Sequence, residues 1–269
     1  MCYIGKMIQQ DFALRVAELV RNDPAVTGLA VAGSWIGSEL DEYSDLDLVL
    51  VTRDKRGGDR EKMLAFAASI PGFISGFTGE HVGESRLLVC LYDNPLLHVD
   101  IKFVTLEEFE DRVEDPVILF ERESALSQVI AAHPSRWPEP DPQWIEDRFW
   151  IWVHYIAGKI GRGEFFEALS NLDFLRMHVL SPLMQLKNLK KARGLRKVET
   201  RLTPADLENL KITVAKYERA SLFKALDNAV SVYRGLRRKV FTPAVALREE
   251  TEKKSMAYLK KEKQKSDKS

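Results

Sequence analysis

The sequence predicts an α+β fold, in which a domain of alternating helices and strands is followed by an all-helical domain. The first observation is that helical and strand periodicities alternate through the first half of the chain. The second is a linker at residues 134–142 that holds four prolines, after which almost every segment has helical period. These observations predict domains at 1–135 and 143–248, followed by a charged tail at 249–269.

The first domain is predicted to begin with a helix at 8–21, whose Phe12, Val16 and Val20 recur at helical spacing. Short apolar runs and a Pro-containing turn at 93–95 predict a set of strands that includes a hairpin. The expected strands are 28–32, 47–52, 86–92 and 96–104, with a helix at 59–70.

The second domain is predicted to be helical because its apolar residues recur at three and four positions. The expected helices are 144–159, 165–180, a new one from Pro182, 204–210 and 222–240. From Glu249 onward the chain is rich in Lys and Glu and poor in apolar residues, which predicts a flexible tail.

The bulk composition narrows the class of protein. The chain has 40 Lys and Arg and 40 Asp and Glu, so a dedicated nucleic-acid binder, which usually has a basic excess, is not expected. A zero net charge is still compatible with a local basic patch, such as the run at 187–201. Two cysteines, Cys2 and Cys90, are too few for a disulfide framework or metal cluster, which favours the cytoplasm. No run approaches the roughly 20 apolar residues that span a bilayer, so no membrane partner is expected.

The most informative segment joins Gly33-Ser34, a gap of ten residues, and Asp45-Leu46-Asp47. Side chains alternate along a strand, so Asp45 and Asp47 share one face. Two close carboxylates repel unless a cation lies between them, and Mg²⁺ is usually held by carboxylates together with substrate phosphates. Glycine at a strand end lets a ligand approach the backbone, and the Ser34 hydroxyl can bind a phosphate. An Asp-x-Asp pair alone is more typical of a solvated turn, and Ser34 alone of a turn residue.

A third carboxylate, Asp100, lies within the apolar run 97–103, where an aspartate without a partner would be costly. A shared metal site would remove that cost. Lys102 follows on the same face and is a candidate partner for Asp100 or for a phosphate.

Together, Gly33-Ser34, Asp45-x-Asp47 and Asp100 resemble the signature of the DNA polymerase beta nucleotidyltransferase superfamily over residues 27–104. The helical segment 149–164 is similar to aminoglycoside 6-adenylyltransferases, which suggests the antibiotic-modifying branch with its aminoglycoside and lincosamide enzymes. The resemblance implies a mixed sheet with flanking helices and a C-terminal helical bundle.

The resemblance also implies a reaction in which AMP from ATP, the triphosphate most expected, passes to a hydroxyl of a small acceptor and pyrophosphate is released. Asp45 and Asp47 would hold Mg²⁺, and Asp100 would bind a second ion or act as base. Gly33, Ser34, Lys102 and Lys159 would contact the nucleotide, although Lys159 equally fits a solvated face. Glu164 and Glu167 are the candidate bases in the second domain. An aminoglycoside acceptor would make the protein an antibiotic-resistance enzyme.

Two other functions remain compatible with the sequence. One is a toxin-like nucleotidyltransferase that modifies tRNA or protein, for which the basic run at 187–201 would provide the contact surface. The other is a nucleotide-binding sensor without turnover, against which the three aspartates count. A dimer is compatible with the helical domain, but the sequence does not determine the oligomeric state.

Overall fold

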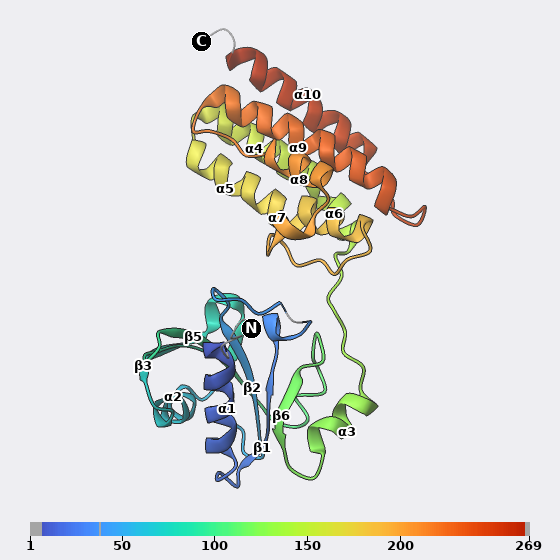
Figure 1. Ribbon diagram of the computed structural model, residues 1–269. Helices are drawn as coiled ribbons and strands as arrows, with labels where there is room; N and C mark the ends of the chain where they lie inside the picture. Colours follow the sequence, from blue (N-terminus) through green and yellow to red (C-terminus); the bar gives the residue numbers. More distant parts are fainter. Residues whose placement is uncertain (1–6, 38, 267–269) are drawn as a thin grey trace, which may run out of the picture. The chain divides into compact units, whose positions relative to one another are not determined.

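A computed structural model describes residues 7–37 and 39–266 (Figure 1). The chain divides into two compact units, Met1–Trp137 and Pro138–Ser269. The first combines a mixed sheet with helices and the second is helical, so the α+β fold class predicted from the sequence is confirmed.

The first unit is built on a six-stranded sheet in the order β3-β4-β5-β2-β1-β6. Its central pair, β2 and β5, is parallel, and all other neighbours are antiparallel. The sheet is therefore mixed, as the resemblance implied. The strands are β1 (Val26–Val31), β2 (Leu46–Thr52), β3 (Phe73–Gly79), β4 (Glu84–Tyr92), β5 (Leu97–Val104) and β6 (Val117–Glu121).

One face of this sheet is fully packed. Helices α1 (Ile8–Val20) and α2 (Arg60–Ser69) contribute Phe12, Val16 and Phe66 to a core that also contains alternate residues of the strands, such as Leu48 and Ile101. Burial of these apolar side chains provides the main stabilisation of the unit.

The opposite face is covered only at one end. There α3 (Ala125–Ala132) supplies Leu126 and Val129 to a smaller cluster with Val51 and Val104. Further along the same two strands this face carries polar side chains that are at least partly exposed, and they include Asp47, His98, Asp100 and Lys102. The fold therefore leaves a polar area on an otherwise apolar sheet.

The second unit is a bundle with its own core (Figure 1). Its long helices are α4 (Pro142–Arg162), α5 (Phe165–Leu175), α9 (Arg219–Val240) and α10 (Glu249–Ser266), and its short ones are α6 (Ser181–Lys187), α7 (Val198–Arg201) and α8 (Pro204–Lys211). Asp141 caps α4 by accepting bonds from two backbone amides, and Gly163 ends it in the left-handed conformation.

Some elements differ from the sequence prediction. Strands β3 and β6 and helix α3 were not anticipated. The glycines of β3, Gly76 and Gly79, hide its strand pattern. The helix expected at 165–180 ends at Leu175, and a π-helical turn, η3 (Arg176–Leu180), joins it directly to α6. The wide turn precedes Pro182, which has no amide to donate to an α-helical bond.

The largest correction concerns the C-terminus, because residues 249–266 form α10 rather than a flexible tail. Leu259 is 1% exposed and belongs to the core of the bundle, and Ser255 is also buried. The Tyr258 ring packs against that of His154 of α4 in a tilted arrangement, with ring centroids 4.3 Å apart. A few well-placed contacts therefore dock a helix whose composition is mostly charged. Residues 267–269 of the predicted tail lie outside the described residues.

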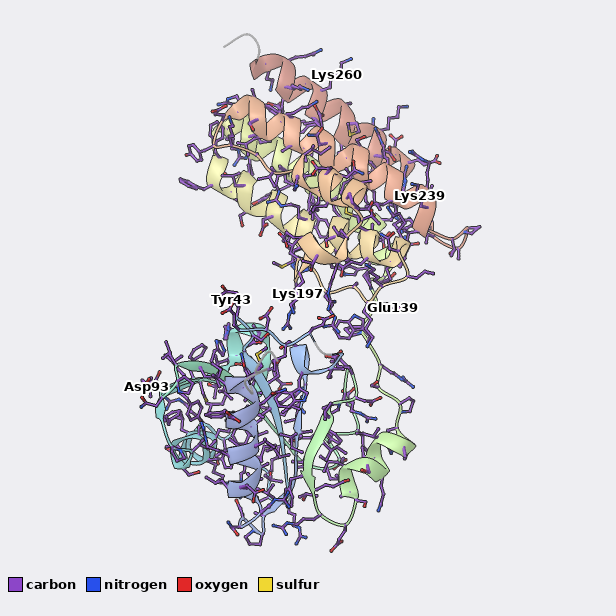
Figure 2. The ribbon with its side chains drawn as sticks, in the orientation of Figure 1. Tyr43, Asp93, Glu139, Lys197, Lys239 and Lys260 are labelled. Carbon is purple, nitrogen blue, oxygen red and sulfur yellow. The ribbon has the colours of Figure 1, made fainter. Side chains whose placement is uncertain are left out.

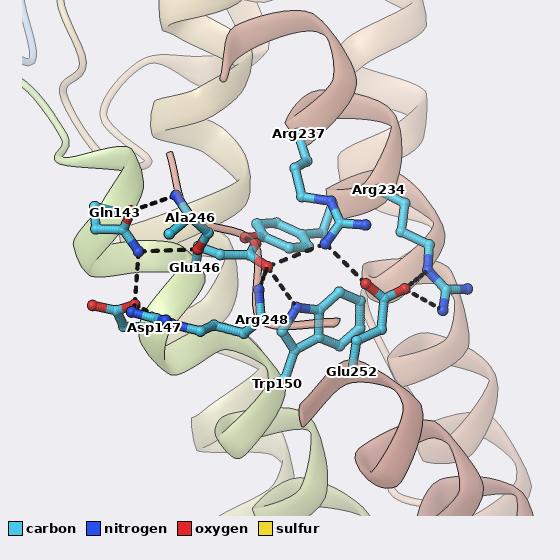
Figure 3. A network of polar contacts seen from close by, with 10 residues as sticks. Gln143, Glu146, Asp147, Trp150, Arg234, Arg237, Ala246, Arg248 and Glu252 are labelled. Atoms are coloured by element: carbon cyan, nitrogen blue, oxygen red, sulfur yellow. Dashed lines mark hydrogen bonds and ion pairs between the residues drawn. The ribbon is translucent and has the colours of Figure 1, made fainter. Parts of the chain in front are cut away.

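A buried carboxylate ties α10 and the segment before it to the bundle (Figure 3). Glu146 of α4 is fully buried, and it accepts hydrogen bonds from Tyr233, from Trp150 Nε1 at 3.2 Å and from the amide of Arg248 at 3.0 Å. Arg237 pairs with Glu146 at 3.2 Å and also with Glu252 of α10 at 2.8 Å. The network therefore couples α4, α9 and α10 in one hydrogen-bonded group.

No helix in the part of the chain that the structure describes has the length and apolar character to cross a bilayer. Cys90 is a free, buried thiol in β4, and burial raises its pKa to about 12. Cys2 lies outside the described residues.

We expect Glu146→Ala to destabilise the protein by about 3–5 kcal/mol, because it leaves the buried Tyr233 hydroxyl without its acceptor and removes one of the two carboxylates that pair with Arg237. Chemical denaturation at neutral pH would measure this loss. The matched control is Glu250→Ala, whose side chain is 72% exposed and which should change stability by less than about 0.5 kcal/mol. Similar losses in both variants would contradict a stabilising role for the network.

Candidate active site

The two aspartates of the Asp-x-Asp motif lie at the start of β2. Leu46 and Leu48 point into the main core, with exposed fractions of 1% each. Since strand side chains alternate, Asp45 and Asp47 point to the opposite, polar face. Both residues are partly exposed, but Asp47 Oδ2 itself is buried.

The Asp47 carboxylate lies directly against Gly33. A Cβ atom added at Gly33 would lie 1.7 Å from Asp47 Oδ2 and 2.7 Å from its Cγ, and Gly33 has a φ of +62°. The backbone is fixed at the same point, because the Ala32 amide donates to the Asp47 carbonyl at 2.9 Å. Only glycine therefore allows this turn and this carboxylate to coexist.

Ser34 follows in the same turn, the 3-10 helix η1 (Gly33–Trp35), and is 5% exposed. Its carbonyl accepts a bond from the Glu39 amide at 3.1 Å, which closes the loop toward the aspartates. The structure therefore places Ser34 in the turn whose Gly33 lies against Asp47. The contact of Ser34 with phosphate remains a prediction.

Asp100 is the direct neighbour of Asp47 across the parallel pair β2–β5. Adjacent strands lie roughly 4.8 Å apart, so the two carboxylates share one small area of the polar face. Burial raises the pKa of Asp100, a hydrogen bond from His98 lowers it, and the charge of Asp45 raises it. The net shift is upward, which makes Asp100 a stronger base than an ordinary carboxylate.

His98 is the partner of Asp100 that the sequence analysis missed. Its Nε2 lies 2.9 Å from Asp100 Oδ1, and the ring is about half exposed. The signal was present, because His98 precedes Asp100 by two residues in a strand and must share its face. The contact between His98 Nε2 and Asp100 Oδ1 predicts that His98 orients the Asp100 carboxylate.

The residues present fit magnesium by their chemistry, since all three candidate ligands are carboxylates. Among residues 7–37 and 39–266, however, no group of three or more His, Cys, Asp or Glu side chains is gathered as a metal cluster. Asp47 and Asp100 are neighbours on adjacent strands, and Asp45 is close enough to affect the pKa of Asp100. This arrangement suits a metal ion that takes only one or two of its ligands from the protein. Mg²⁺ commonly binds one or two carboxylates and completes its shell with substrate phosphates and water.

Lys102 does not pair with Asp100, which was one of its two expected partners. Its Nζ lies 3.0 Å from Glu84 Oε2, and Glu84 also binds Arg86 at 2.7 Å. Hydrogen bonds from Arg86, followed by those from Lys102, lower the pKa of Glu84 to about 2. A phosphate contact of Lys102 would therefore have to compete with Glu84.

The candidates of the second unit form one cluster on α4 and α5. Lys159 Nζ lies 2.6 Å from Glu164 and 2.9 Å from Glu167, and Tyr155 donates to Glu167. The two glutamates raise the pKa of Lys159, while the bonds from Tyr155 and Lys159 lower that of Glu167. Lys159 is thus held by carboxylates of its own unit. Its nucleotide contact, and a role of Glu164 or Glu167 as base, remain predictions.

Comparisons with known proteins give only distant similarity. No family model and no curated protein matches the chain. Among solved structures, an aminoglycoside 6-adenyltransferase from Bacillus subtilis superposes with a TM-score of 0.41 and 13% identity, covering 94% of this chain and 97% of that one. A nucleotidyltransferase-like protein from Exiguobacterium sibiricum 255-15 gives 0.34 and 15%, covering 83% and 74%. The chain is thus similar to these proteins at low identity.

We expect Gly33→Ala to destabilise the protein by about 3 kcal/mol, because its Cβ would displace the Asp47 carboxylate and because φ is positive. The matched control is Gly37→Ala in the same loop, where φ is +80° but no atom lies within 4 Å of the added Cβ. That variant should lose only about 1 kcal/mol, the cost of the backbone conformation. Denaturation midpoints would compare them, and equal losses would contradict the contact with Asp47.

The low pKa of Glu84 predicts a pH dependence of stability. A carboxyl group with a depressed folded-state pKa stabilises the protein above its unfolded-state pKa and loses this effect as the pH falls through the folded value. We expect Glu84→Gln to lose about 1–2 kcal/mol at pH 7, after allowance for solvent screening. The difference from wild type should shrink between about pH 4.5 and pH 2. A difference that does not change with pH would contradict the ion pairs.

Proposed function

We propose that this protein is a magnesium-dependent nucleotidyltransferase that moves a nucleoside monophosphate, AMP from ATP in the first instance, onto a hydroxyl of an acceptor. The observation that carries the proposal is the pairing of Asp47 with Asp100 on adjacent parallel strands, beside the Gly33-Ser34 turn. Carboxylates next to a glycine turn form an arrangement suited to a metal-bound triphosphate.

In the proposed reaction the acceptor oxygen forms a bond to the α-phosphorus, the bond from that phosphorus to the bridging β-oxygen breaks, and pyrophosphate leaves. Asp100 takes the proton of the acceptor hydroxyl, a role that its raised pKa favours. His98 holds the Asp100 carboxylate in place. Magnesium held by Asp45 and Asp47 would neutralise charge on the triphosphate.

The Gly33-Ser34 turn contributes to the reaction by positioning the triphosphate. Its glycine lets the triphosphate approach the backbone where the Asp47 carboxylate already lies, and the Ser34 hydroxyl binds a phosphate oxygen. Asp47 and Ser34 therefore hold the nucleotide, and Asp100 faces the acceptor.

The acceptor that we propose first is a small hydroxylated cation of the aminoglycoside kind, which would make the protein a resistance enzyme. Two arguments support it: the resemblance of residues 149–164 to aminoglycoside 6-adenylyltransferases, in a chain whose residues 27–104 resemble the wider nucleotidyltransferase superfamily, and the charge of the first unit. Residues 1–137 hold 13 Lys and Arg against 23 Asp and Glu, a net charge of −10. Such a field attracts cationic ligands.

Transfer from ATP labelled at the α-phosphorus tests this function. With Mg²⁺ and a panel of aminoglycosides and lincosamides, we expect labelled product from wild type and a loss of at least about a hundredfold in Asp47→Asn and Asp100→Asn. The matched control is Asp93→Asn in the exposed turn between β4 and β5, which should retain full activity. Mutant rates equal to wild type would contradict the proposed site, and Mg²⁺-dependent ATP binding without any product would favour a sensor.

A further inference from the structure

The balanced charge of the whole chain conceals two oppositely charged units. Residues 138–269 hold 27 Lys and Arg against 17 Asp and Glu, a net charge of +10, which cancels the −10 of residues 1–137. The expectation that nucleic acid is an improbable partner rested on the total of zero. That total does not describe either unit, and a basic helical unit has the electrostatic character of a polyanion binder.

The exposed cations of this unit include a row along α9 and α10. The two helices run antiparallel, because Arg234 pairs with Glu252 at 2.7 Å while the earlier Asp227 pairs with the later Lys263. On the solvent side of these pairs lie four exposed cations, two from each helix, which we call the α9–α10 stripe. They are Lys224, Arg238, Lys253 and Lys260.

Helical geometry places the members of the stripe in line. Lys224 lies three residues before Asp227 and Arg238 four residues after Arg234, so both belong to the edge of α9 that faces α10. Lys253 and Lys260 are two turns apart on α10, about 10 Å along its axis. The side chains of Lys239 and Lys260 project from the surface of the bundle (Figure 2). The stripe is therefore a linear set of cations with the reach of several phosphates.

The denser basic run at 187–201 is a weaker candidate, because part of its charge is used within the unit. Lys187 pairs with the buried Asp206, and Lys190 donates to the Arg201 carbonyl. These bonds hold the loop between α6 and α8.

We propose that the α9–α10 stripe binds the phosphates of RNA. The net charge of +10 would attract any polyanion. Among polyanions we choose RNA because it also carries the free hydroxyls that the proposed transfer needs, so this choice rests on the proposed function. The binding itself does not require the reaction. Where both hold, RNA is a second class of acceptor beside the small cation proposed above.

Binding is tested with the full chain and fluorescein-labelled bulk tRNA by fluorescence anisotropy, from 50 to 200 mM KCl. With four phosphate contacts, we expect the logarithm of affinity to fall with the logarithm of salt with a slope of about −3. In the double variant Lys253→Glu/Lys260→Glu, affinity at 100 mM KCl should fall about tenfold or more, and the slope should flatten by about 1.5. Circular dichroism would show that α10 remains folded.

The matched control is Lys211→Glu/Lys216→Glu, which changes the net charge equally at exposed positions of the same unit but outside the stripe. It should retain most of the affinity. Equal losses in both double variants, no binding by wild type, or equal competition by inorganic polyphosphate would overturn the proposal. Asp47→Asn should bind tRNA like wild type while failing in transfer to any acceptor, so failure of the binding surface and failure of the proposed reaction are distinguishable.

Discussion

The contact between the Asp47 carboxylate and the α-carbon of Gly33 is the constraint on which the candidate site depends. It requires a glycine with positive φ where β1 ends, and it fixes the turn that carries Ser34 against the strand that carries the aspartates. The parallel pairing of β2 and β5 then sets Asp100 beside Asp47. A short-range steric requirement and a strand register thus position every carboxylate of the site, and the two core-packed faces of the strands hold that register.

Charge is distributed between the units in a way that the total conceals. The acidic unit carries the candidate site and suits cationic ligands and metal ions, whereas the basic unit suits polyanions. Within the second unit the buried carboxylates are paired: Glu146 is surrounded by donors, and Asp206 pairs with Lys187. Exposed charge therefore determines what each unit attracts, whereas the paired buried carboxylates help to hold the helices of the second unit together.

Much of the fold and the motif could be predicted from local patterns. The alternation of side chains along β2 and β5 could be predicted because both strands are long, apolar and bounded by turn residues. That alternation predicted that Asp45, Asp47 and Asp100 lie on one face of the sheet. Strand β3 was hidden by its glycines, and α10 by its charges, since only Leu259 and a few neighbours dock it. The pairing of Lys102 with Glu84 rather than Asp100 depends on a neighbouring strand, which no pattern within β5 reveals.

The most direct test of the site is a crystal structure of the protein with Mn²⁺ and a non-hydrolysable ATP analogue. Manganese scatters anomalously and accepts the oxygen ligands that magnesium uses. We expect an anomalous peak bounded by the carboxylates of Asp45 and Asp47 and by analogue phosphates, with the Gly33-Ser34 backbone against those phosphates. An analogue bound elsewhere, or a manganese peak away from these carboxylates, would contradict the proposed site.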